Sequence, residues 1–234
     1  MIKAVLFDVG STLLEADPEI DDMFYQVCRR RGHELDHNEV KQHLPTINEF
    51  YETEYLKDGD FWCSPQGSVE IFLDMYRYLS HLMGVEHDCE GIAHDINEAY
   101  LKREAWRVYE DVIPCLRELK KQTVALGVVS NWSPNLSSLL RDLSLLPYFD
   151  VVTSSAEVGY RKPNRVIFDL TLELMGFKAH EVVHVGDRID ADGVGAKAAG
   201  ITPIIIDRHQ KLTSDCGYLH TDSLQKIPSM LMEL

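Results

Sequence analysis

The sequence predicts an α/β protein in which a parallel β-sheet core carries an inserted all-helical domain. Two observations support this fold class. Short apolar runs rich in β-branched residues alternate with helical patterns at the start and in the second half of the chain, whereas the stretch between them shows helical spacing. At 234 residues the chain is also long enough for a core domain with a smaller domain inserted in it.

The predicted strands are almost uninterrupted apolar runs, a pattern typical of strands that are covered on both faces of a parallel sheet. A shorter candidate is the pair Val151 and Val152. Parallel strands require crossover connections, which are right-handed. The four clear runs are residues 2–7, 124–129, 181–185 and 202–206.

Apolar residues at helical spacing separate these runs, around residues 116–120, 136–143, 166–175 and 194–199. From about residue 18 to residue 106 the helical spacing continues without a convincing strand. The simplest account is a helical insertion after the first strand. We therefore predict a core domain of residues 1–16 and 108–234, and a helical domain of residues 17–107.

Composition and charge narrow the function. Apolar residues at 45% and charged residues at 26% are typical of a globular protein. A net charge of −15 argues against binding to nucleic acid or to an anionic membrane, because both depend on basic patches. It leaves room for a small anionic substrate, which N–H groups, a lysine and a divalent cation can bind locally.

The five cysteines are scattered and form no C-x-x-C pair, so neither a disulfide framework nor a zinc site is expected. The N-terminal apolar run lacks the basic region of a secretory signal, and no apolar stretch has membrane-spanning length. We expect a cytoplasmic protein that is a monomer or a homodimer.

Polar residues of complementary chemistry follow the predicted strands. In an open parallel sheet, ligands bind beyond the carboxyl ends of the strands, so these residues are expected to meet at one edge. The four segments are DVGST from Asp8, SN from Ser130, GYRKP from Gly159 and GDRIDAD from Gly186. Their convergence predicts an active site.

Phosphoryl transfer needs a nucleophile, positive charge near the transferring oxygens, donors that hold these oxygens and usually a hard cation. Asp8 is the predicted nucleophile, because its carboxylate can form an aspartyl phosphate. Mg²⁺ prefers oxygen ligands and keeps several waters. Asp8, Asp187 and the main-chain carbonyl of Gly10 are therefore its predicted protein ligands.

The other roles also have candidates. Ser130 and backbone N–H groups around Gly10 and at Asn131 are predicted to hold the phosphoryl oxygens, while Lys162 supplies positive charge. Asp192 is predicted to orient the waters of the metal or Lys162. The predicted catalytic residues are Asp8, Ser130 and Lys162, and the predicted substrate-binding residues are Gly10, Ser11, Thr12, Ser130, Asn131 and Lys162.

Each candidate also has an ordinary structural interpretation. An aspartate such as Asp8 often caps the turn after a strand. Ser130 and Asn131 suit the start of a helix, and Lys162 on its own is more often a surface residue. The occurrence of all these residues at strand ends favours the functional interpretation. His184, within an apolar strand, is more often a core histidine than a base.

Four segments resemble the ordered motifs of the haloacid dehalogenase superfamily of hydrolases: FDVGSTL, VVSNW, EVGYRKP and VGDRIDADGVGAKAAG. The resemblance covers the whole core, and the helical insertion is similar to the all-helical cap domain of this family. It implies a Rossmann-like core, a mobile cap that closes over the site and an aspartyl-enzyme intermediate. We expect a Mg²⁺-dependent phosphatase of small phosphorylated metabolites.

Gly10 departs from the family pattern. Phosphatases that this chain resembles usually have a second aspartate there, which acts as general acid and base, and losing such a group typically costs about 10²–10⁴-fold in rate. The alternatives are a dehalogenase or a phosphonate hydrolase on the same scaffold, or a binding or regulatory protein with low turnover. The sequence does not identify the substrate or the group that replaces the missing acid.

Overall fold

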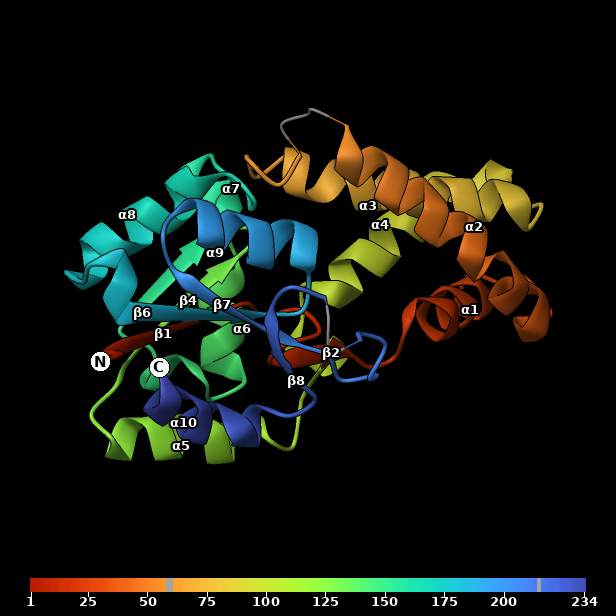
Figure 1. The fold of residues 1–234 in the computed structure, drawn as a ribbon. Coiled ribbons are helices and arrows are strands. Elements are labelled where there is room, and N and C mark those ends of the chain that lie inside the picture. Colours follow the sequence, from red (N-terminus) through yellow and green to blue (C-terminus); the bar gives the residue numbers. More distant parts are fainter. Residues whose placement is uncertain (58–60, 214–215) are drawn as a thin grey trace. The chain divides into compact units, whose positions relative to one another are not determined.

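The computed structural model describes residues 1–57, 61–213 and 216–234. The chain divides into two compact units, which can be followed by colour in Figure 1. The first unit comprises Met1–Glu15 and Val108–Leu234, and the second comprises Ala16–Arg107. Each unit has a hydrophobic cluster of its own.

A six-stranded parallel sheet forms the centre of the first unit, in the order β5-β4-β1-β6-β7-β8. Because parallel neighbours cannot be joined by tight turns, helices connect most of them. The predicted α/β fold with a Rossmann-like parallel sheet is confirmed. Its strands are β1 (Ala4–Phe7), β4 (Ala125–Ser130), β5 (Val151–Ser154), β6 (Val182–Gly186), β7 (Thr202–Ile206) and β8 (Leu219–Thr221).

Helices cover both faces of this sheet. Residues of α8 and α9 pack against Ala4 and Leu6 on one face of β1, and Figure 1 shows α5 and α10 on the other face. All four side chains of β1 are buried, which accounts for its continuous apolar pattern. The helices of this unit are α5 (Val112–Lys121), α6 (Leu136–Asp142), α7 (Ser155–Val158), α8 (Arg165–Met175), α9 (Val194–Ala198) and α10 (Ile227–Met230).

Local signals fix the ends of α8. The side chain of Asn164 accepts a hydrogen bond from the Val166 N–H at 3.0 Å, which caps the first turn. Gly176 follows the last residue with a φ of 74°, a left-handed conformation that glycine adopts without a steric penalty. The helix therefore begins at Arg165 and ends at Met175. The peptide bond between Lys162 and Pro163, shortly before it, is cis.

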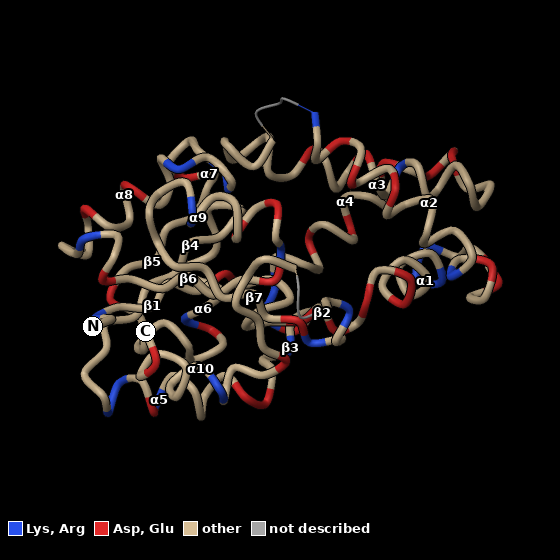
Figure 2. The backbone as a smooth tube through the Cα atoms, in the orientation of Figure 1, with Lys and Arg blue, Asp and Glu red and all other residues tan. Residues whose placement is uncertain are grey.

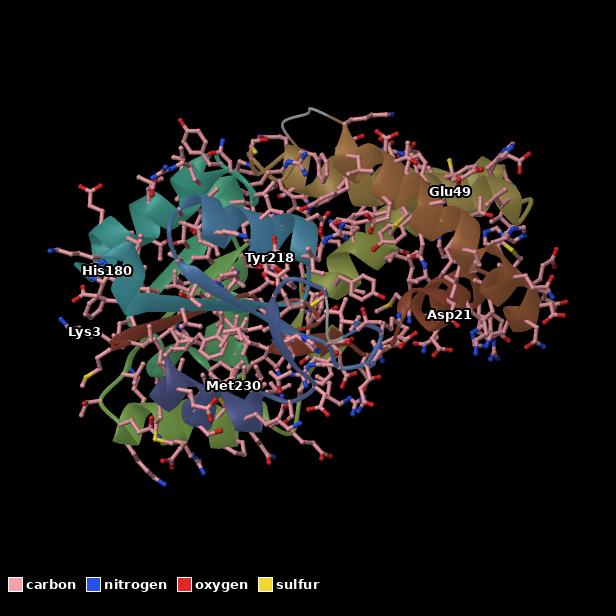
Figure 3. The ribbon with its side chains drawn as sticks, viewed as in Figure 1. Lys3, Asp21, Glu49, His180, Tyr218 and Met230 are labelled. Atoms are coloured by element: carbon pink, nitrogen blue, oxygen red, sulfur yellow. The ribbon has the colours of Figure 1, made fainter. Side chains whose placement is uncertain are left out.

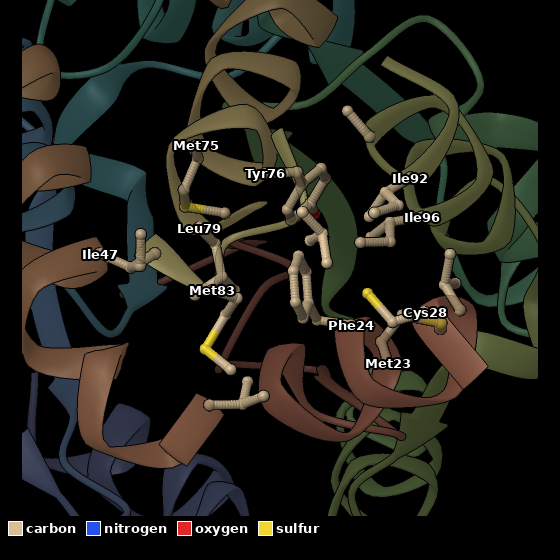
Figure 4. Packing of buried hydrophobic residues seen from close by; sticks show 14 of the residues in the cluster. Met23, Phe24, Cys28, Ile47, Met75, Tyr76, Leu79, Met83, Ile92 and Ile96 are labelled. Atoms are coloured by element: carbon tan, nitrogen blue, oxygen red, sulfur yellow. The ribbon is translucent and has the colours of Figure 1, made fainter. Parts of the chain in front are cut away.

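The second unit is built mainly from helices that pack around one apolar cluster. Figure 4 shows Phe24, Tyr76, Leu79, Ile92 and Ile96 facing one another within this cluster, and these side chains are buried. Their spacing follows the helical period, so one face of each helix supplies the core. The helices are α1 (Ile20–Arg30), α2 (His37–Leu56), α3 (Gly67–Leu82) and α4 (Cys89–Tyr100).

Charged residues occur along both units, and acidic ones are in excess (Figure 2). Lys3, labelled in Figure 3, lies just before β1 and forms an ion pair with Glu181 at 2.6 Å at the amino end of the sheet. In the ranges that the structure describes, no helix is both long enough and apolar enough to cross a bilayer.

The predicted strands and helices of the core are all present, and their ends differ from the predicted ones by at most four residues. Three strands were not predicted: β8, and the pair β2 (Leu14–Ala16) and β3 (Trp106–Val108) that forms a two-stranded sheet. Each is three residues long, which is too short to show a hydrophobic period. The expectation that no strand occurs up to residue 106 is thus wrong at Trp106, where β3 begins.

Candidate active site

The carboxyl ends of β1, β4 and β6 bring the predicted site residues together. Asp8 directly follows β1, Ser130 is the last residue of β4 and is buried, and Asp187 directly follows β6. Phe7 lies opposite Val185 in the parallel register of β1 and β6. The N–H of Asp8 donates to the Val185 carbonyl at 2.8 Å, so the backbone of Asp8 is fixed to β6.

Lys162 joins two of the carboxylates. Its Nζ lies 2.6 Å from Oδ1 of Asp8 and 2.6 Å from Oδ1 of Asp192, and all three side chains are buried. Burial by itself would lower the pKa of Lys162, but Asp192 and Asp8 outweigh this effect and hold its pKa above the usual value. Lys162 therefore remains a cation beside Asp8.

Asp192 is buried and accepts three hydrogen bonds. Its Oδ1 accepts from Lys162 and from Nε2 of His184 at 2.8 Å, and its Oδ2 accepts from the Arg188 N–H at 3.0 Å. Burial would raise the pKa of Asp192, but Lys162 and His184 hold it below its usual range. Asp192 is therefore an anion that anchors Lys162.

A π-helical turn, Ile189–Gly193, carries Asp192 back to the end of β6. The backbone of Gly186 approaches the Asp192 carboxyl so closely that a Cβ on Gly186 would lie 2.2 Å from Asp192 Cγ. Only glycine leaves room for this contact. The glycine and the aspartate of this segment are thus parts of one packing arrangement.

The side chain of Asn131 fixes the backbone of Lys162. Its Oδ1 accepts from the Lys162 N–H at 2.7 Å, and its Nδ2 donates to the Lys162 carbonyl at 3.1 Å. The amide thus makes the two bonds that a neighbouring strand would make. The Asn131 side chain therefore holds the segment after β5 against the end of β4. Because this side chain is used in that way, only the backbone of Asn131 is available for a substrate.

The loop after Asp8 is held by its own backbone. The Val9 carbonyl accepts from the N–H groups of Thr12 and Leu14 at 3.3 Å and 2.9 Å, and the Ser11 N–H donates to the Leu14 carbonyl at 2.8 Å. The N–H groups of Ser11 and Thr12 are therefore used within the loop. The Oγ1 of Thr12 is buried and has no hydrogen-bond partner among the described residues.

Gly10 lies in this loop without a steric need for glycine. A Cβ at this position would meet the Trp132 ring at 3.6 Å, which is an ordinary van der Waals distance. Its φ is not among the positive values of the chain's glycines. The structure around Gly10 thus has room for at least one more carbon atom.

Carboxylate oxygens of Asp8, Asp187 and Asp192 lie within 4.8 Å of one another. Loss of hydration raises the pKa of Asp187 well above its usual value, and the charges of Asp8 and Asp192 raise it further. Lys162 alone does not balance three carboxylates. A hard divalent cation fits this set of oxygen donors and would relieve the repulsion.

The structure brings Asp8, Lys162, Asp187 and Asp192 together, and it places Ser130 and Asn131 at the same edge of the sheet. Sequence reasoning missed two contacts. His184 was expected to be a core residue, but it also donates to Asp192. Arg208 donates to the carbonyls of the loop after Asp8. Of these two residues, only His184 is marked by the sequence, because it is a polar residue in an apolar strand, two positions before Gly186.

Comparison with known proteins bears on this geometry. A family model described as haloacid dehalogenase-like hydrolase matches residues 2–200. The chain is 30% identical to the glyceraldehyde 3-phosphate phosphatase of Methanocaldococcus jannaschii over 247 aligned positions, covering all of this chain and 99% of the relative. The match therefore includes both units.

Solved structures show the same fold. A HAD phosphatase from Thermococcus onnurineus is 26% identical, with a TM-score of 0.67 and 98% of each chain covered. The L-2-haloacid dehalogenase from Xanthobacter autotrophicus is 20% identical, with a TM-score of 0.72 and full coverage of both chains. At 20% identity, the similarity to the dehalogenase concerns the fold alone.

Proposed function

Because the chain belongs to the haloacid dehalogenase-like hydrolases, we propose that it is a Mg²⁺-dependent phosphatase that cleaves the phosphate ester of a small metabolite. The name of the relative from Methanocaldococcus jannaschii, glyceraldehyde 3-phosphate phosphatase, supports this class of substrate. The observation that carries the proposal is the placement of Lys162 between Asp8 and Asp192, next to Asp187.

In the proposed reaction, a carboxylate oxygen of Asp8 attacks phosphorus, and the bond between phosphorus and the ester oxygen breaks. The alcohol takes up a proton and leaves, while the phosphoryl group stays on Asp8. Water then attacks phosphorus, the bond to Asp8 breaks, and inorganic phosphate is released. The Lys162 ammonium, 2.6 Å from Asp8, stabilises the negative charge on the transferring oxygens.

Asp8, Asp187 and the Gly10 carbonyl would hold Mg²⁺, which supplies further charge neutralisation. The buried Asp192 takes part as an anchor, because it binds the Lys162 ammonium that also contacts Asp8. Ser130 and the backbone of Asn131 at the end of β4 are the proposed donors for the phosphoryl oxygens.

The second unit is the proposed cap domain, residues 17–107, and residues 1–16 and 108–234 are the proposed hydrolase core. The division of the chain after Glu15 and before Val108 supports these limits. A cap excludes water during transfer and selects the substrate. The scattered cysteines support a cytoplasmic location, which is also part of the proposal.

The first test is hydrolysis of an aryl phosphate with and without Mg²⁺. Turnover should require Mg²⁺, and Asp8→Asn should lower kcat by at least about 1,000-fold, because the attacking carboxylate is lost. Asp190→Asn is the matched control. Asp190 lies in the same π-helical turn as Asp192, but its half-exposed carboxylate pairs with Arg188. Turnover that survives Asp8→Asn would rule the proposal out.

The second test addresses the missing acid. Gly10→Asp should raise kcat on alkyl phosphates by about 10²-fold and leave aryl phosphates nearly unchanged, because only poor leaving groups need a proton. The space beside Trp132 accommodates the added Cβ. No gain would mean that another group already donates the proton. Metal-independent release of halide or cleavage of a phosphonate would instead favour the alternatives.

A further inference from the structure

Arg208 contacts the loop that follows Asp8, although it lies beyond the residues that the family model matches. It comes two residues after β7. Its Nε donates to the Ser11 carbonyl at 3.2 Å, and its Nη2 donates to the Thr12 carbonyl at 2.5 Å. The side chain is 13% exposed, so these bonds are largely sheltered from water.

Two further residues of the same unit hold the guanidinium. Asp111 accepts from Nη1 and Nη2 of Arg208 at 3.1 Å each, and the Arg208 Cζ lies 3.6 Å from the centroid of the Tyr109 ring. Burial by itself would raise the pKa of Asp111, but Arg208 and the N–H of Leu224 hold it below its usual value. A bidentate pair with an ionised carboxylate fixes the plane of the guanidinium.

The loop needs this support. Ser11 has a φ of 54°, a left-handed conformation that costs energy for a serine and persists where the surroundings impose it. Its N–H is held within the loop by the Leu14 carbonyl. Its own carbonyl is held by Arg208, so both ends of the strained residue are fixed.

We propose that Arg208 is a positioning residue that fixes the backbone of residues 9–14. Through this loop it sets the position of Asp8, which is joined to Val9, and of the Gly10 carbonyl. The catalytic consequence rests on the proposed function, whereas the fixing of the loop does not. Neither effect requires Arg208 to touch the substrate.

Amide hydrogen exchange of the loop tests the fixing directly. Arg208→Met removes all donors and keeps an apolar stem over Tyr109, and Arg208→Lys keeps the charge without the planar fork. Exchange in residues 9–14 should accelerate about tenfold or more in the Met variant and less in the Lys variant, with wild-type rates elsewhere in the sheet. Arg165→Met is the control, since Arg165 pairs with Asp169 on the surface of α8.

Kinetics test the consequence. With an aryl phosphate and Mg²⁺, kcat of Arg208→Met should fall about 10-fold to 100-fold, since misplaced reacting groups cost rates of this order, while KM changes by less than about twofold. If Arg208→Met does not fold, Arg208→Lys decides by the same measurements.

Unchanged exchange in residues 9–14 would overturn the proposal, as would acceleration spread evenly over the whole sheet, which a purely structural role produces. A faster loop with an unchanged kcat would overturn it as well. If the wild-type protein hydrolyses no phosphate ester, the proposed function fails, and the exchange rates alone decide the role of Arg208.

Discussion

Asp192 shows how a single residue organises the site. It is buried, and a buried carboxylate is costly unless several donors compensate for its lost hydration. His184 is one of these donors. Its Nδ1 is buried without a hydrogen-bond partner among the described residues, whereas its Nε2 lies 2.8 Å from the Asp192 carboxylate and donates to it.

Replacing His184 separates the hydrogen bond from mere packing. His184→Leu should lower the free energy of unfolding by about 1.5–3 kcal/mol, since it leaves a charged acceptor short of a donor. It should also lower kcat, because Lys162 loses a firm anchor. His184→Gln places an N–H within similar reach of Asp192 and should keep most of the free energy of unfolding and most of kcat. Urea unfolding and aryl phosphate kinetics measure these effects, and equal losses in the two variants would contradict this role.

Asp187 makes the stability of the protein depend on pH and metal. Its pKa is raised in the folded state, so its contribution to stability is fully present below its unfolded pKa, about 3.9, and is lost as the pH rises through the folded value. Without Mg²⁺, Asp187→Asn should therefore be more stable than the wild type at pH 8. The difference should shrink towards pH 4.

Mg²⁺ should reverse this order. At about 100 times its Kd, it should stabilise the wild type by about 2.7 kcal/mol and the Asn variant by much less. Thermal unfolding with Mg²⁺ or with a chelator measures both effects. An Asn variant that is stabilised as strongly as the wild type would show that Asp187 does not bind the metal.

The sequence predicts individual residues well where a motif fixes their place at a strand end. Asp8, Lys162 and Asp192 belong to such segments, and the structure joins them directly. His184 and Arg208 act through contacts that sequence spacing does not reveal. Arg208 meets Ser11 from a part of the chain 197 residues away, and nothing local in its neighbourhood indicates this partner.

At the scale of elements, β6 and the π-helical turn after it behave as one packed piece. Gly186→Ala would place a methyl group 2.2 Å from Asp192 Cγ, so the turn must shift. We expect a loss of about 1–3 kcal/mol in the free energy of unfolding. Gly10→Ala is the matched control, because the closest contact of its methyl group would be 3.6 Å. It should change the free energy of unfolding by no more than about 0.5 kcal/mol. Similar values for both variants in urea unfolding would refute this account.

Apolar runs predicted β1, β4, β6 and β7 because these strands are covered on both faces, which leaves an unambiguous pattern. The π-helical turn could not be predicted in the same way. Its residues, IDADG, carry no hydrophobic period, and its shape follows from the contact between Asp192 and Gly186 rather than from local preference.

At the scale of the whole molecule, the two units have separate cores. The buried residues of the cluster in the second unit lie between Met23 and Ala105, and none of them belongs to the six-stranded sheet. We therefore expect a fragment of residues 16–107 to fold alone, with a helical circular dichroism spectrum and a cooperative thermal transition. A fragment that melts without a cooperative transition would show that its core is insufficient.

The change in hydrophobic period indicated the insertion, because a helical stretch between strands cannot belong to the sheet. The exact points where the units join could not be predicted. They fall beside the three-residue strands β2 and β3, whose pairing depends on residues about 90 positions apart and not on a local pattern.

The amide of Asn131 has a consequence for how this scaffold evolves. It grips the main chain of residue 162 and makes no demand on the side chain there. A mutation at Lys162 therefore leaves both main-chain bonds to Asn131 possible, but it removes the cation that pairs with Asp8 and Asp192. Descendants of this protein could therefore change residue 162 most readily together with Asp8 or Asp192, because the main chain at this position has an anchor of its own in Asn131.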